Sequence, residues 1–466
     1  MKVEQIYTKC LSQASYIIDN NGECAVIDPL REVDYYIKRA KKNRSEIKYI
    51  LQTHFHADFV SGHLTLSKIT GAKIIYGPNA DPKYEATICK DGDIFSVGNL
   101  SIKVIHTPGH TLESVSYLLF DEENKPSSIF TGDTLFLGDV GIPDVAQRYE
   151  NLTKEDLAGT LFDSINIKIK PLDENLIIYP GHGAGSACGK NMMKATSDTL
   201  KNQKLVNYSM NGTVNKNEFI KKLTDNLPEP PAYFPSNVIL NKDGYDDIDN
   251  VIKSSLNKIS NEKIEFFQNQ EDVVFIDTRK RSHYIKSHIK GSIFIGLEGR
   301  FAPWVGELLK SIDTKIIVVC NKDKEVEAIT RLARIGFDKC IGFIVDEPRM
   351  WKKYNINIDS INNIKSKEFI DILKVKRIGV IDVRSESEYK ENHIESATNI
   401  PLSILESGLS KIDKNSEYYL HCAGGYRSII AISILKKLGY EKLINIQEGF
   451  KGIRETNLNI SCFNSL

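Results

Sequence analysis

An ordered series of histidine and aspartate residues runs through the first 182 positions of the chain. It begins in the stretch THFHADFVSGH and continues in PGHT, TGDT and YPGHG. The members of the series are His54, His56, Asp58, His110, Asp133 and His182. Imidazole and carboxylate groups are preferred ligands of zinc and non-haem iron, and the neighbouring glycines allow the backbone to turn towards one centre. The series therefore predicts a metal site.

A second reactive group lies near the C-terminus, in the stretch HCAGGYRS. Cys422 ends an apolar run, a glycine-rich loop follows, and IIAISILKKLGY then has the pattern of a helix. The N–H groups of such a loop and of the helix N-terminus favour a thiolate and attract an anion. Arg427 adds a positive charge five residues after the cysteine. This pattern predicts a nucleophilic cysteine.

Short β-rich runs carry the first series. IKYILQT, IKVIHTP, SIFTGD and LIIYPGH each end in one of its polar clusters. They alternate with helical patterns, which indicates a mixed α/β domain. Strand ends that feed loops on one rim of a scaffold are where sites usually form.

The second half of the chain repeats itself. VVFIDTRKRSHYIKSHIKGSIFI, from 273, aligns with IGVIDVRSESEYKENHIESATNI, from 378. The copies place Asp277 opposite Asp382 and Arg279 opposite Arg384, each 105 positions apart. We expect two compact α/β modules with mainly parallel sheets.

The first copy lacks the second copy's reactive loop. Cys320 is followed by NKDKEVEA, which has no glycine and no arginine at the fifth position. Its acidic residues would oppose a thiolate and repel an anion. We therefore expect the first module to have a packing role.

Composition narrows the class of protein. The 466 residues suggest about three domains, and 61 basic residues balance 61 acidic ones, so nucleic acid and anionic membranes are not expected partners. The sequence contains no long apolar segment and no signal-like N-terminus, and its eight cysteines show no disulfide or zinc-ribbon spacing. We expect a cytoplasmic protein.

HxHxD, PGHT, GDT and GHG, in this order, resemble the metallo-β-lactamase superfamily over residues 1–235. The resemblance implies an αββα sandwich. Two-metal members have a histidine where this chain has Phe59, so one position of the second metal is missing. Similarity to the superfamily's persulfide dioxygenases implies one Fe(II) per chain. The implied iron ligands are His54, His110 and Asp133, and the implied hydrogen-bonding residues around them are His56, Asp58 and His182.

Two further local features bear on this resemblance, one at Ile142 and one at Cys188. Persulfide dioxygenases often carry arginine where this chain has Ile142, which removes a direct cation for an anionic substrate. Cys188 follows His182 by six residues and is either a sulfur relay or a buried structural thiol.

The stretch from Cys422 to Arg427 resembles the rhodanese loop, and the surrounding IDVR and NIP segments match that family too. The resemblance makes Cys422 the sulfur-carrying nucleophile and Arg427 part of its cradle, with Asp382 and Arg384 as a structural pair. The expected fold is an α/β sandwich followed by two α/β/α rhodanese-like modules. The expected boundaries are 1–235 for the metal domain, 236–261 for a linker, 262–358 for a degenerate module and 359–466 for an active one. Around the start of the linker, the four prolines of LPEPPAYFPSNVILNKD, residues 227–243, favour extended backbone over a helix.

This domain order resembles fusions of persulfide dioxygenase and sulfurtransferase used in sulfide detoxification. The resemblance implies a thiol persulfide and O2 as substrates, sulfite as the oxidised product and sulfur acceptor, thiosulfate as the final product, and a homo-oligomer. Two alternatives stay open. One is a dinuclear zinc hydrolase of the glyoxalase II type that carries a sulfurtransferase domain. The other is a persulfide carrier or sensor without turnover.

Overall fold

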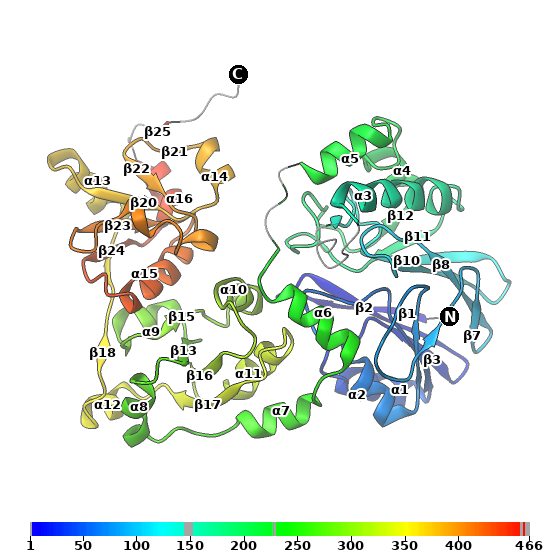
Figure 1. Cartoon of the computed structure of the whole chain (residues 1–466), viewed down its shortest axis with the longest axis horizontal. Helices are drawn as coiled ribbons and strands as arrows, with labels where there is room; N and C mark the ends of the chain where they lie inside the picture. Colours follow the sequence, from blue (N-terminus) through cyan, green and yellow to red (C-terminus); the bar gives the residue numbers. More distant parts are fainter. Residues whose placement is uncertain (1, 144–151, 226, 228–229, 457–459, 462–466) are drawn as a thin grey trace. The chain divides into compact units, whose positions relative to one another are not determined.

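The computed structural model describes residues 2–143, 152–225, 227, 230–456 and 460–461 (Figure 1). The chain divides into two compact units. The first comprises residues 1–251 together with 309–312 and 330–338, and the second comprises 252–308, 313–329 and 339–466. Among the described helices, none is long and apolar enough to cross a membrane.

Two six-stranded mixed sheets form the first unit. The first sheet is antiparallel from β1 to β3 and parallel from β3 to β6. Its strands are β1 (Lys2–Thr8), β2 (Gln13–Asn20), β3 (Glu23–Ile27), β4 (Glu46–Leu51), β5 (Lys73–Tyr76) and β6 (Thr87–Ile88). The second sheet has the order β12-β11-β10-β9-β8-β7, and only β10 and β11 pair in parallel. Its strands are β7 (Ile94–Val97), β8 (Leu100–His106), β9 (Val115–Phe120), β10 (Pro126–Gly132), β11 (Ile177–Pro180) and β12 (Asp198–Thr199).

Apolar side chains between the two sheets form the core of the first unit. Tyr16 and Ile75 of the first sheet share one buried cluster with Val104 and Phe130 of the second. A second cluster packs the other face of the second sheet against helices. The helices of the unit are α1 (Asp34–Asn43), α2 (His63–Thr70), α3 (Lys154–Asp163), the π-helical η2 (Ser164–Ile169), α4 (Leu200–Val206), α5 (Lys216–Thr224), α6 (Phe234–Asp243) and the start of α7 (Ile248–Ser255). This arrangement confirms the predicted αββα sandwich.

The expected linker is helical rather than extended. Residues 236–261 contain most of α6 and all of α7, although the prolines before them predicted extended backbone. Pro235 lies in the first turn of α6, where its missing N–H costs no hydrogen bond and its fixed φ suits a helix. The expectation of an extended segment was therefore wrong, while the domain boundaries stay predictions.

Two parallel sheets form the second unit. The sheet of the first module has the order β15-β13-β16-β17, and that of the second module has the order β19-β24-β23-β20-β22. The first sheet comprises β13 (Val273–Asp277), β15 (Ile293–Phe294), β16 (Lys315–Cys320) and β17 (Cys340–Val345). The second comprises β19 (Asn362–Ile364), β20 (Gly379–Asp382), β22 (Ala397–Asn399), β23 (Tyr418–His421) and β24 (Leu443–Ile446). Short pairs add β14 (His288–Ile289) with β18 (Ile358–Asp359) and β21 (His393–Ile394) with β25 (Ile460–Ser461).

Helices surround both parallel sheets. The first module has α8 (Asn261–Gln268), α9 (Arg281–Lys286), α10 (Phe301–Leu308), α11 (Glu325–Ala333) and α12 (Pro348–Lys353). The second has α13 (Ser366–Val375), α14 (Glu386–Glu391), η3 (Leu402–Ile404), η4 (Leu409–Lys411), α15 (Arg427–Lys437) and α16 (Gly449–Arg454). The sequence repeat thus corresponds to two structural repeats, as predicted.

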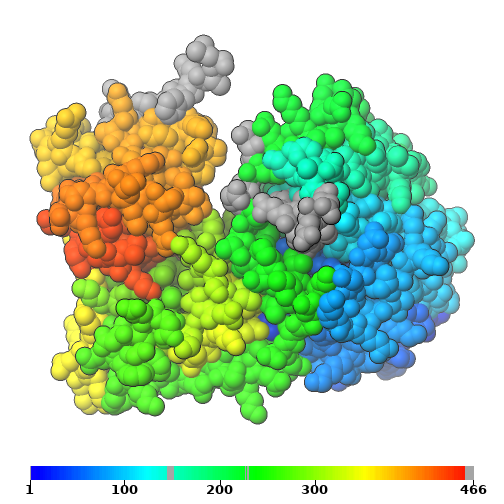
Figure 2. Space-filling view, viewed as in Figure 1, coloured from blue at the N-terminus to red at the C-terminus, as the bar shows by residue number. Residues whose placement is uncertain are grey.

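The two modules of the second unit share buried apolar surface. Tyr284 and Phe294 of the first module belong to the same cluster as Leu420 and Ile432 of the second. Figure 2 shows the yellow-green atoms of the first module against the red and orange atoms of the second. Burial of this shared surface stabilises the pair, because each buried aliphatic or aromatic side chain contributes about 1.5–3 kcal/mol.

Candidate functional sites: a metal centre and a cysteine loop

Four loops at strand ends carry the predicted metal residues. His54 follows β4, His110 follows β8, Asp133 directly follows β10, and His182 follows β11. All four side chains are buried. The sandwich therefore brings residues far apart in sequence to one end of its two sheets.

His54, His110 and Asp133 form one group of neighbouring ligand atoms. The Nε2 atom of His110 lies 3.6 Å from Asp133 Oδ2, and that of His54 lies 4.0 Å from the same oxygen. One ligand atom from each residue lies within 4.8 Å of the others. Bonds of about 2.1 Å to a common ion place ligand atoms roughly 3–3.5 Å apart, so a small closure suffices. Two imidazoles and one carboxylate on one face fit a divalent transition metal with open positions.

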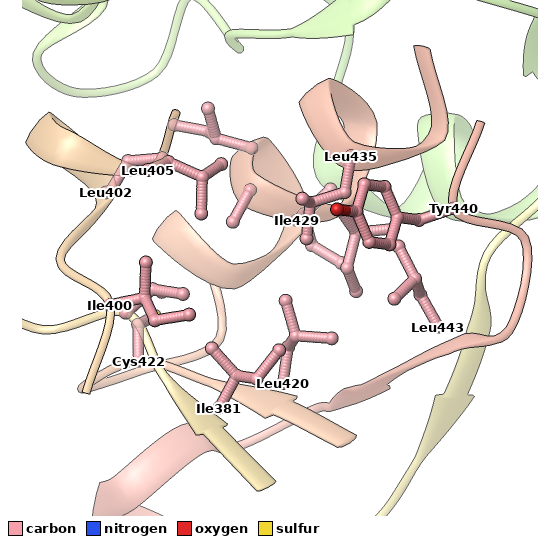
Figure 3. Close-up of a cluster of buried hydrophobic side chains, with 14 of the residues drawn as sticks. Ile381, Ile400, Leu402, Leu405, Leu420, Cys422, Ile429, Leu435, Tyr440 and Leu443 are labelled. Carbon is pink, nitrogen blue, oxygen red and sulfur yellow. The ribbon is translucent and has the colours of Figure 1, made fainter. Parts of the chain in front are cut away.

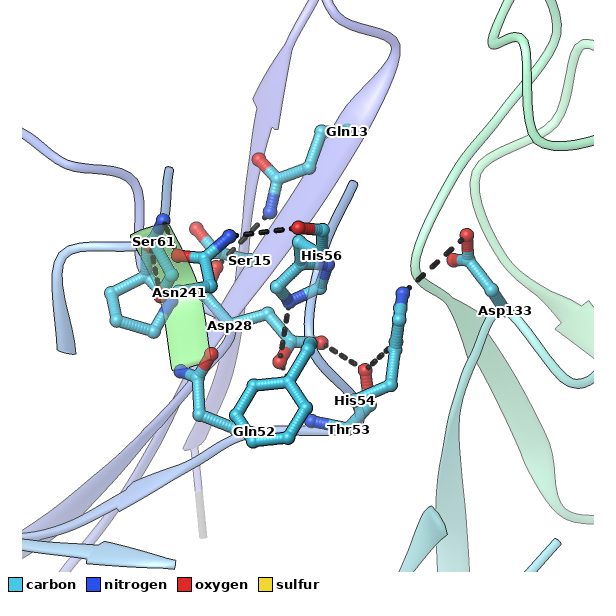
Figure 4. A network of polar contacts seen from close by, with 12 residues as sticks. Gln13, Ser15, Asp28, Gln52, Thr53, His54, His56, Ser61, Asp133 and Asn241 are labelled. Carbon is cyan, nitrogen blue, oxygen red and sulfur yellow. Dashed lines mark hydrogen bonds and ion pairs between the residues drawn. The ribbon is translucent and has the colours of Figure 1, made fainter. Parts of the chain in front are cut away.

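Hydrogen bonds orient both imidazoles of this group. The Nδ1 atom of His110 lies 2.8 Å from the Ile142 carbonyl oxygen. The hydroxyl of Thr53 lies 2.9 Å from His54 Nδ1 and donates to Asp28 Oδ2 at 2.8 Å (Figure 4). With Nδ1 engaged in each ring, Nε2 faces Asp133 and is the atom available to a metal. Thr53 and Asp28 were not among the predicted residues.

The charge states within the group suit metal binding. Burial and the neighbouring His56 ring lower the pKa of His54 well below its ordinary value, which favours the neutral, ligating imidazole. Burial alone would raise the pKa of Asp133, but His182, His54 and His110 together hold it far below its ordinary value. The site therefore presents neutral imidazole beside an ionised carboxylate.

His182 links the two predicted aspartates. Its Nδ1 atom lies 2.8 Å from Asp133 Oδ1, and its Nε2 atom lies 2.8 Å from Asp58 Oδ2. Burial lowers the pKa of His182, but the two carboxylates outweigh this effect and hold it well above its ordinary value. Asp58, His182 and Cys188 also form a second group whose ligand atoms lie within 4.8 Å of one another. The fold thus brings Cys188, the proposed relay residue, to the site.

His56 and Phe59 belong to the loop after β4 that also carries His54 and Asp58. His56 Nε2 is 3.1 Å from Asp28 Oδ1 but lacks hydrogen-bond geometry, so neither of its ring nitrogens has a hydrogen-bond partner among the described residues. The Phe59 side chain is fully buried, and its ring centroid lies 4.4 Å from that of His56. Phe59 therefore fills the position after Asp58 with an apolar ring that offers no ligand atom.

Helix α6, within the expected linker, supports this loop. The Asn241 amide donates to the carbonyl oxygens of His56 and Phe59, both at 2.8 Å, and its own oxygen accepts from the Ser61 N–H. Asn241 was not among the predicted residues, because a single asparagine on a helix forms no recognisable motif. Three hydrogen bonds nevertheless make it a support of the metal-binding loop.

Two glycines allow the loops to approach one another. A Cβ atom at Gly181 would lie 2.5 Å from Asp133 Oδ1. Gly109 has a φ of +140°, and a Cβ there would lie 2.3 Å from Leu161 Cα in α3. The loop that carries His110 therefore rests directly on α3.

Ile142 stands where persulfide dioxygenases often have an arginine. Its side chain is buried in the apolar cluster, and its carbonyl oxygen contacts His110.

The cysteine loop of the second module follows β23. Cys422 is almost completely buried at the edge of an apolar cluster (Figure 3). The Gly425 N–H donates to Cys422 Sγ at 3.1 Å. The Ser428 hydroxyl lies 3.8 Å from the same sulfur and donates to Asn445 Oδ1 at 2.7 Å. The loop then enters α15. One backbone N–H and one hydroxyl thus face the sulfur, where the glycines had predicted a ring of backbone N–H groups.

Arg427 is engaged by a carboxylate rather than by the sulfur. Its two terminal nitrogens donate to the two oxygens of Glu388, each at 2.7 Å. Burial would raise the pKa of Glu388, but the hydrogen bonds from Arg427 and Ser385 lower it to about 2. Arg427 therefore ties the start of α15 to α14, and its role in the sulfur cradle stays a prediction. Glu388 was not predicted.

Cys320 lies in a different environment, although its position is equivalent. Burial raises its pKa to about 12, and Glu325 and Asp277 add to the shift. One oxygen of Glu325 is buried with no hydrogen-bond partner in the described part of the chain. These features agree with the expected packing role of the first module.

Comparison with known proteins assigns each domain. Residues 8–182 match the metallo-beta-lactamase superfamily, and residues 260–346 and 365–456 match the rhodanese-like domain. A probable hydroxyacylglutathione hydrolase of Schizosaccharomyces pombe is 30% identical over 207 residues, which cover 44% of this chain and 73% of the relative.

Solved structures are also similar to the chain. A metallo-beta-lactamase from Staphylococcus aureus subsp. aureus COL is 31% identical with a TM-score of 0.65. The match covers 74% of this chain and 98% of the other. ETHE1 from Myxococcus xanthus is 27% identical with a TM-score of 0.43, covering 52% of this chain and 100% of the other. The chain therefore belongs to the metallo-β-lactamase superfamily and carries two rhodanese-like domains after its metal-binding domain.

Proposed function

We propose that the chain is a non-haem Fe(II) persulfide dioxygenase coupled to a rhodanese sulfurtransferase. The overall oxidation is RSSH + O2 + H2O → RSH + SO3²⁻ + 2H⁺. Cys422 then supplies a second sulfane sulfur to sulfite and thiosulfate forms. Both halves act on the sulfane sulfur of a thiol persulfide, which gives a chemical reason for their presence in one chain.

The observation that carries this proposal is Phe59. It is fully buried beside His56 and offers no ligand atom after Asp58. Asp58 is in turn hydrogen-bonded to His182. Of the two groups of neighbouring ligand atoms, only His54, His110 and Asp133 combine two imidazoles with one carboxylate. This donor set is typical of mononuclear non-haem iron rather than of two zinc ions.

The protein residues have separate tasks in this proposal. Iron(II), when bound, would supply open positions for sulfur and dioxygen and would relay electrons from the persulfide sulfur to dioxygen. Thr53 and the Ile142 carbonyl hold the two histidine rings in their ligating orientation. His182 positions the Asp133 carboxylate through its 2.8 Å hydrogen bond. The buried walls keep bulk water away from the site.

The transfer half uses the Cys422 sulfur. Its thiolate attacks the outer sulfur of a persulfide, a new S–S bond forms, and the donor S–S bond breaks: Cys422–S⁻ + RSSH → Cys422–SSH + RS⁻. After loss of its proton the outer sulfur passes to sulfite: Cys422–SS⁻ + SO3²⁻ → Cys422–S⁻ + S2O3²⁻. The Gly425 N–H is placed to stabilise the negative sulfur in both steps.

A dinuclear hydrolase of the glyoxalase II type is the second candidate. Sequence likeness alone favours it over the dioxygenase, because the curated relatives include hydroxyacylglutathione hydrolases of 30% identity. The second ligand group, Asp58, His182 and Cys188, could hold another ion. Phe59 argues against a complete second position.

Metal content and oxygen uptake together test the proposal. The full chain is purified anaerobically, its iron and zinc are counted, and oxygen consumption is followed with thiol persulfides and thioester hydrolysis with a hydroxyacyl thioester. About one iron per chain with persulfide-dependent oxygen uptake supports the dioxygenase. Two zinc ions with thioester hydrolysis establish the hydrolase instead. Persulfide binding without oxygen uptake leaves a carrier or sensor.

A further inference from the structure

One peptide unit in the cysteine loop is held from both sides. The N–H of Gly425 donates to Cys422 Sγ at 3.1 Å. The carbonyl oxygen of the same peptide belongs to Gly424 and accepts from Arg281 Nη1 at 3.0 Å. Because a trans peptide is planar with its C=O and N–H pointing in opposite directions, the contact at the oxygen fixes where the N–H points.

The orientation of this peptide decides the polarity around the sulfur. If the peptide plane turned over, its carbonyl oxygen would face the sulfur and repel a thiolate or persulfide anion. Glycine at both positions leaves this rotation sterically cheap, since no Cβ opposes it. A Cβ at Gly424 would meet no heavy atom within 4 Å, so that side of the peptide is open. The loop therefore needs an external contact to keep the N–H inward.

Arg281 comes from the first module, which lacks a reactive loop. It begins α9, is half-buried, and forms no ion pair with any carboxylate in the described ranges. Two neighbouring contacts also reach the loop from that module. The Tyr426 hydroxyl donates to the Gly296 carbonyl oxygen at 3.2 Å, and the Tyr426 and Phe294 ring centroids lie 5.4 Å apart. The first module thus lines the loop of the second.

We propose that Arg281 is a positioning residue for Cys422, locking the Gly424–Gly425 peptide with its N–H towards the sulfur. The degenerate module would then contribute to sulfur transfer without a reactive cysteine of its own. The guanidinium of Arg281, which forms no ion pair in the described ranges, also places a positive charge beside Gly424, where an added Cβ would meet no heavy atom within 4 Å. The inference rests on the proposed role of Cys422 as the sulfur carrier.

The test measures Cys422 alkylation by iodoacetamide as a function of pH in the full chain, followed by mass spectrometry of the Cys422 peptide. R281M removes the donor and the charge but keeps an unbranched apolar stem. We expect alkylation about tenfold slower at neutral pH and a rate profile moved to higher pH, because one charged hydrogen bond is worth about that factor. R281K, which keeps a charge and one donor, should recover part of the rate.

K280M is the matched control, because Lys280 is exposed, precedes Arg281 and lies 3.8 Å from Glu298. Wild-type rates in K280M support the proposal. Unchanged alkylation in R281M, or an equal loss in both variants, overturns it, since the peptide lock would then have no effect beyond net charge. If R281M fails to fold, R281K and R281Q are compared with the wild-type protein instead. Alkylation profiles of both variants that equal the wild-type profile also overturn the proposal.

The sulfurtransferase role is read separately, as the gain of one sulfur atom on Cys422 from a persulfide donor. Wild-type Cys422 that alkylates normally but never gains sulfur overturns the proposed function. The alkylation profiles of the Arg281 variants still decide the peptide lock in that case.

Discussion

Each of the two rhodanese-like modules has a cysteine at the end of the corresponding strand of its own sheet. The residues around the two cysteines differ. Cys320 ends β16 and lies near Glu325 and Asp277, which add to the effect of burial and raise its pKa to about 12. Cys422 follows β23 and accepts a hydrogen bond from the Gly425 N–H. The few residues after the strand, rather than the sheet itself, therefore decide the charge and the hydrogen bonding around the cysteine.

The supporting structure is the same in both modules. Arg279 is paired with Asp277 at 2.7 Å, and Arg384 is paired with Asp382 at 2.6 Å. Each arginine also lies over an aromatic ring, that of Trp351 in the first module and that of Phe450 in the second. A buried charge without its partner costs several kcal/mol, so these pairs hold the carboxyl ends of β13 and β20 whether or not the loop is reactive.

The largest expected difference concerns the cysteines themselves. C422S should lower persulfide-to-sulfite sulfur transfer by on the order of a thousandfold or more, because the nucleophile is lost. C320S should leave the rate within about twofold. Thiosulfate formation from a persulfide and sulfite measures both variants. Equal losses would break the comparison between the modules.

Thiol reactivity should differ almost as strongly. A pKa of about 12 instead of 9.0 lowers the thiolate fraction of Cys320 by about a thousandfold at pH 8. The native chain should therefore show almost no alkylation of the Cys320 peptide while the Cys422 peptide is modified. Denatured protein, in which both thiols titrate normally, is the control. Rapid labelling of native Cys320 would contradict the difference in environment.

Alanine substitutions at the two loop glycines, Gly424 and Gly425, should differ in their effect on stability. Gly425 has a φ of +77°, and a Cβ there would lie 2.0 Å from the Gln447 carbonyl oxygen. G425A should lower the free energy of unfolding by about 2 kcal/mol or more, through backbone strain and steric overlap. G424A should be nearly neutral, because nothing lies within 4 Å of its added Cβ. Thermal unfolding of the full chain compares the two, and similar melting temperatures would contradict the loop geometry.

The smallest expected effect concerns the ion pair between Glu388 and Arg427. In the folded protein the pKa of Glu388 is about 2, below the ordinary 4.5. The Glu388 carboxylate therefore stabilises the fold above pH 4.5 and loses this contribution as the pH falls through about 2. The pair is partly exposed, so E388Q should cost less than about 1 kcal/mol at neutral pH. Denaturant unfolding of both proteins at pH 7 and pH 3 should show the gap narrowing at the lower pH. A gap that widens at low pH would contradict the assigned shift.

The sequence predicted the fold because its evidence was local and repeated. Apolar runs ending in His54, His110, Asp133 and His182 could be read as strand ends, and a constant spacing of 105 revealed the duplicated module. The three metal candidates then met in one group. The roles assigned to these residues stay predictions, since geometry does not identify the metal or the reaction.

Other features depend on contacts that sequence patterns do not record. Asn241 supports the metal loop from a helix 182 positions after Phe59, and Arg281 reaches the cysteine loop from 143 positions before Gly424. Neither residue belongs to a motif. The helix at Phe234–Asp243 was missed because its nearby prolines suggested extended chain, although one of them begins the helix.

The contact between Gly109 and Leu161 makes the His110 loop depend on the stability of α3, which begins at the protein surface. Helix α3 starts with a capping box in which Thr153 accepts from the Asp156 N–H and Asp156 accepts from the Thr153 N–H. If that first turn frays, the wall behind the His110 loop loosens. Ageing or warming of the protein would then release the ion before the sandwich unfolds, and strengthening a solvent-facing cap would prolong the loaded state.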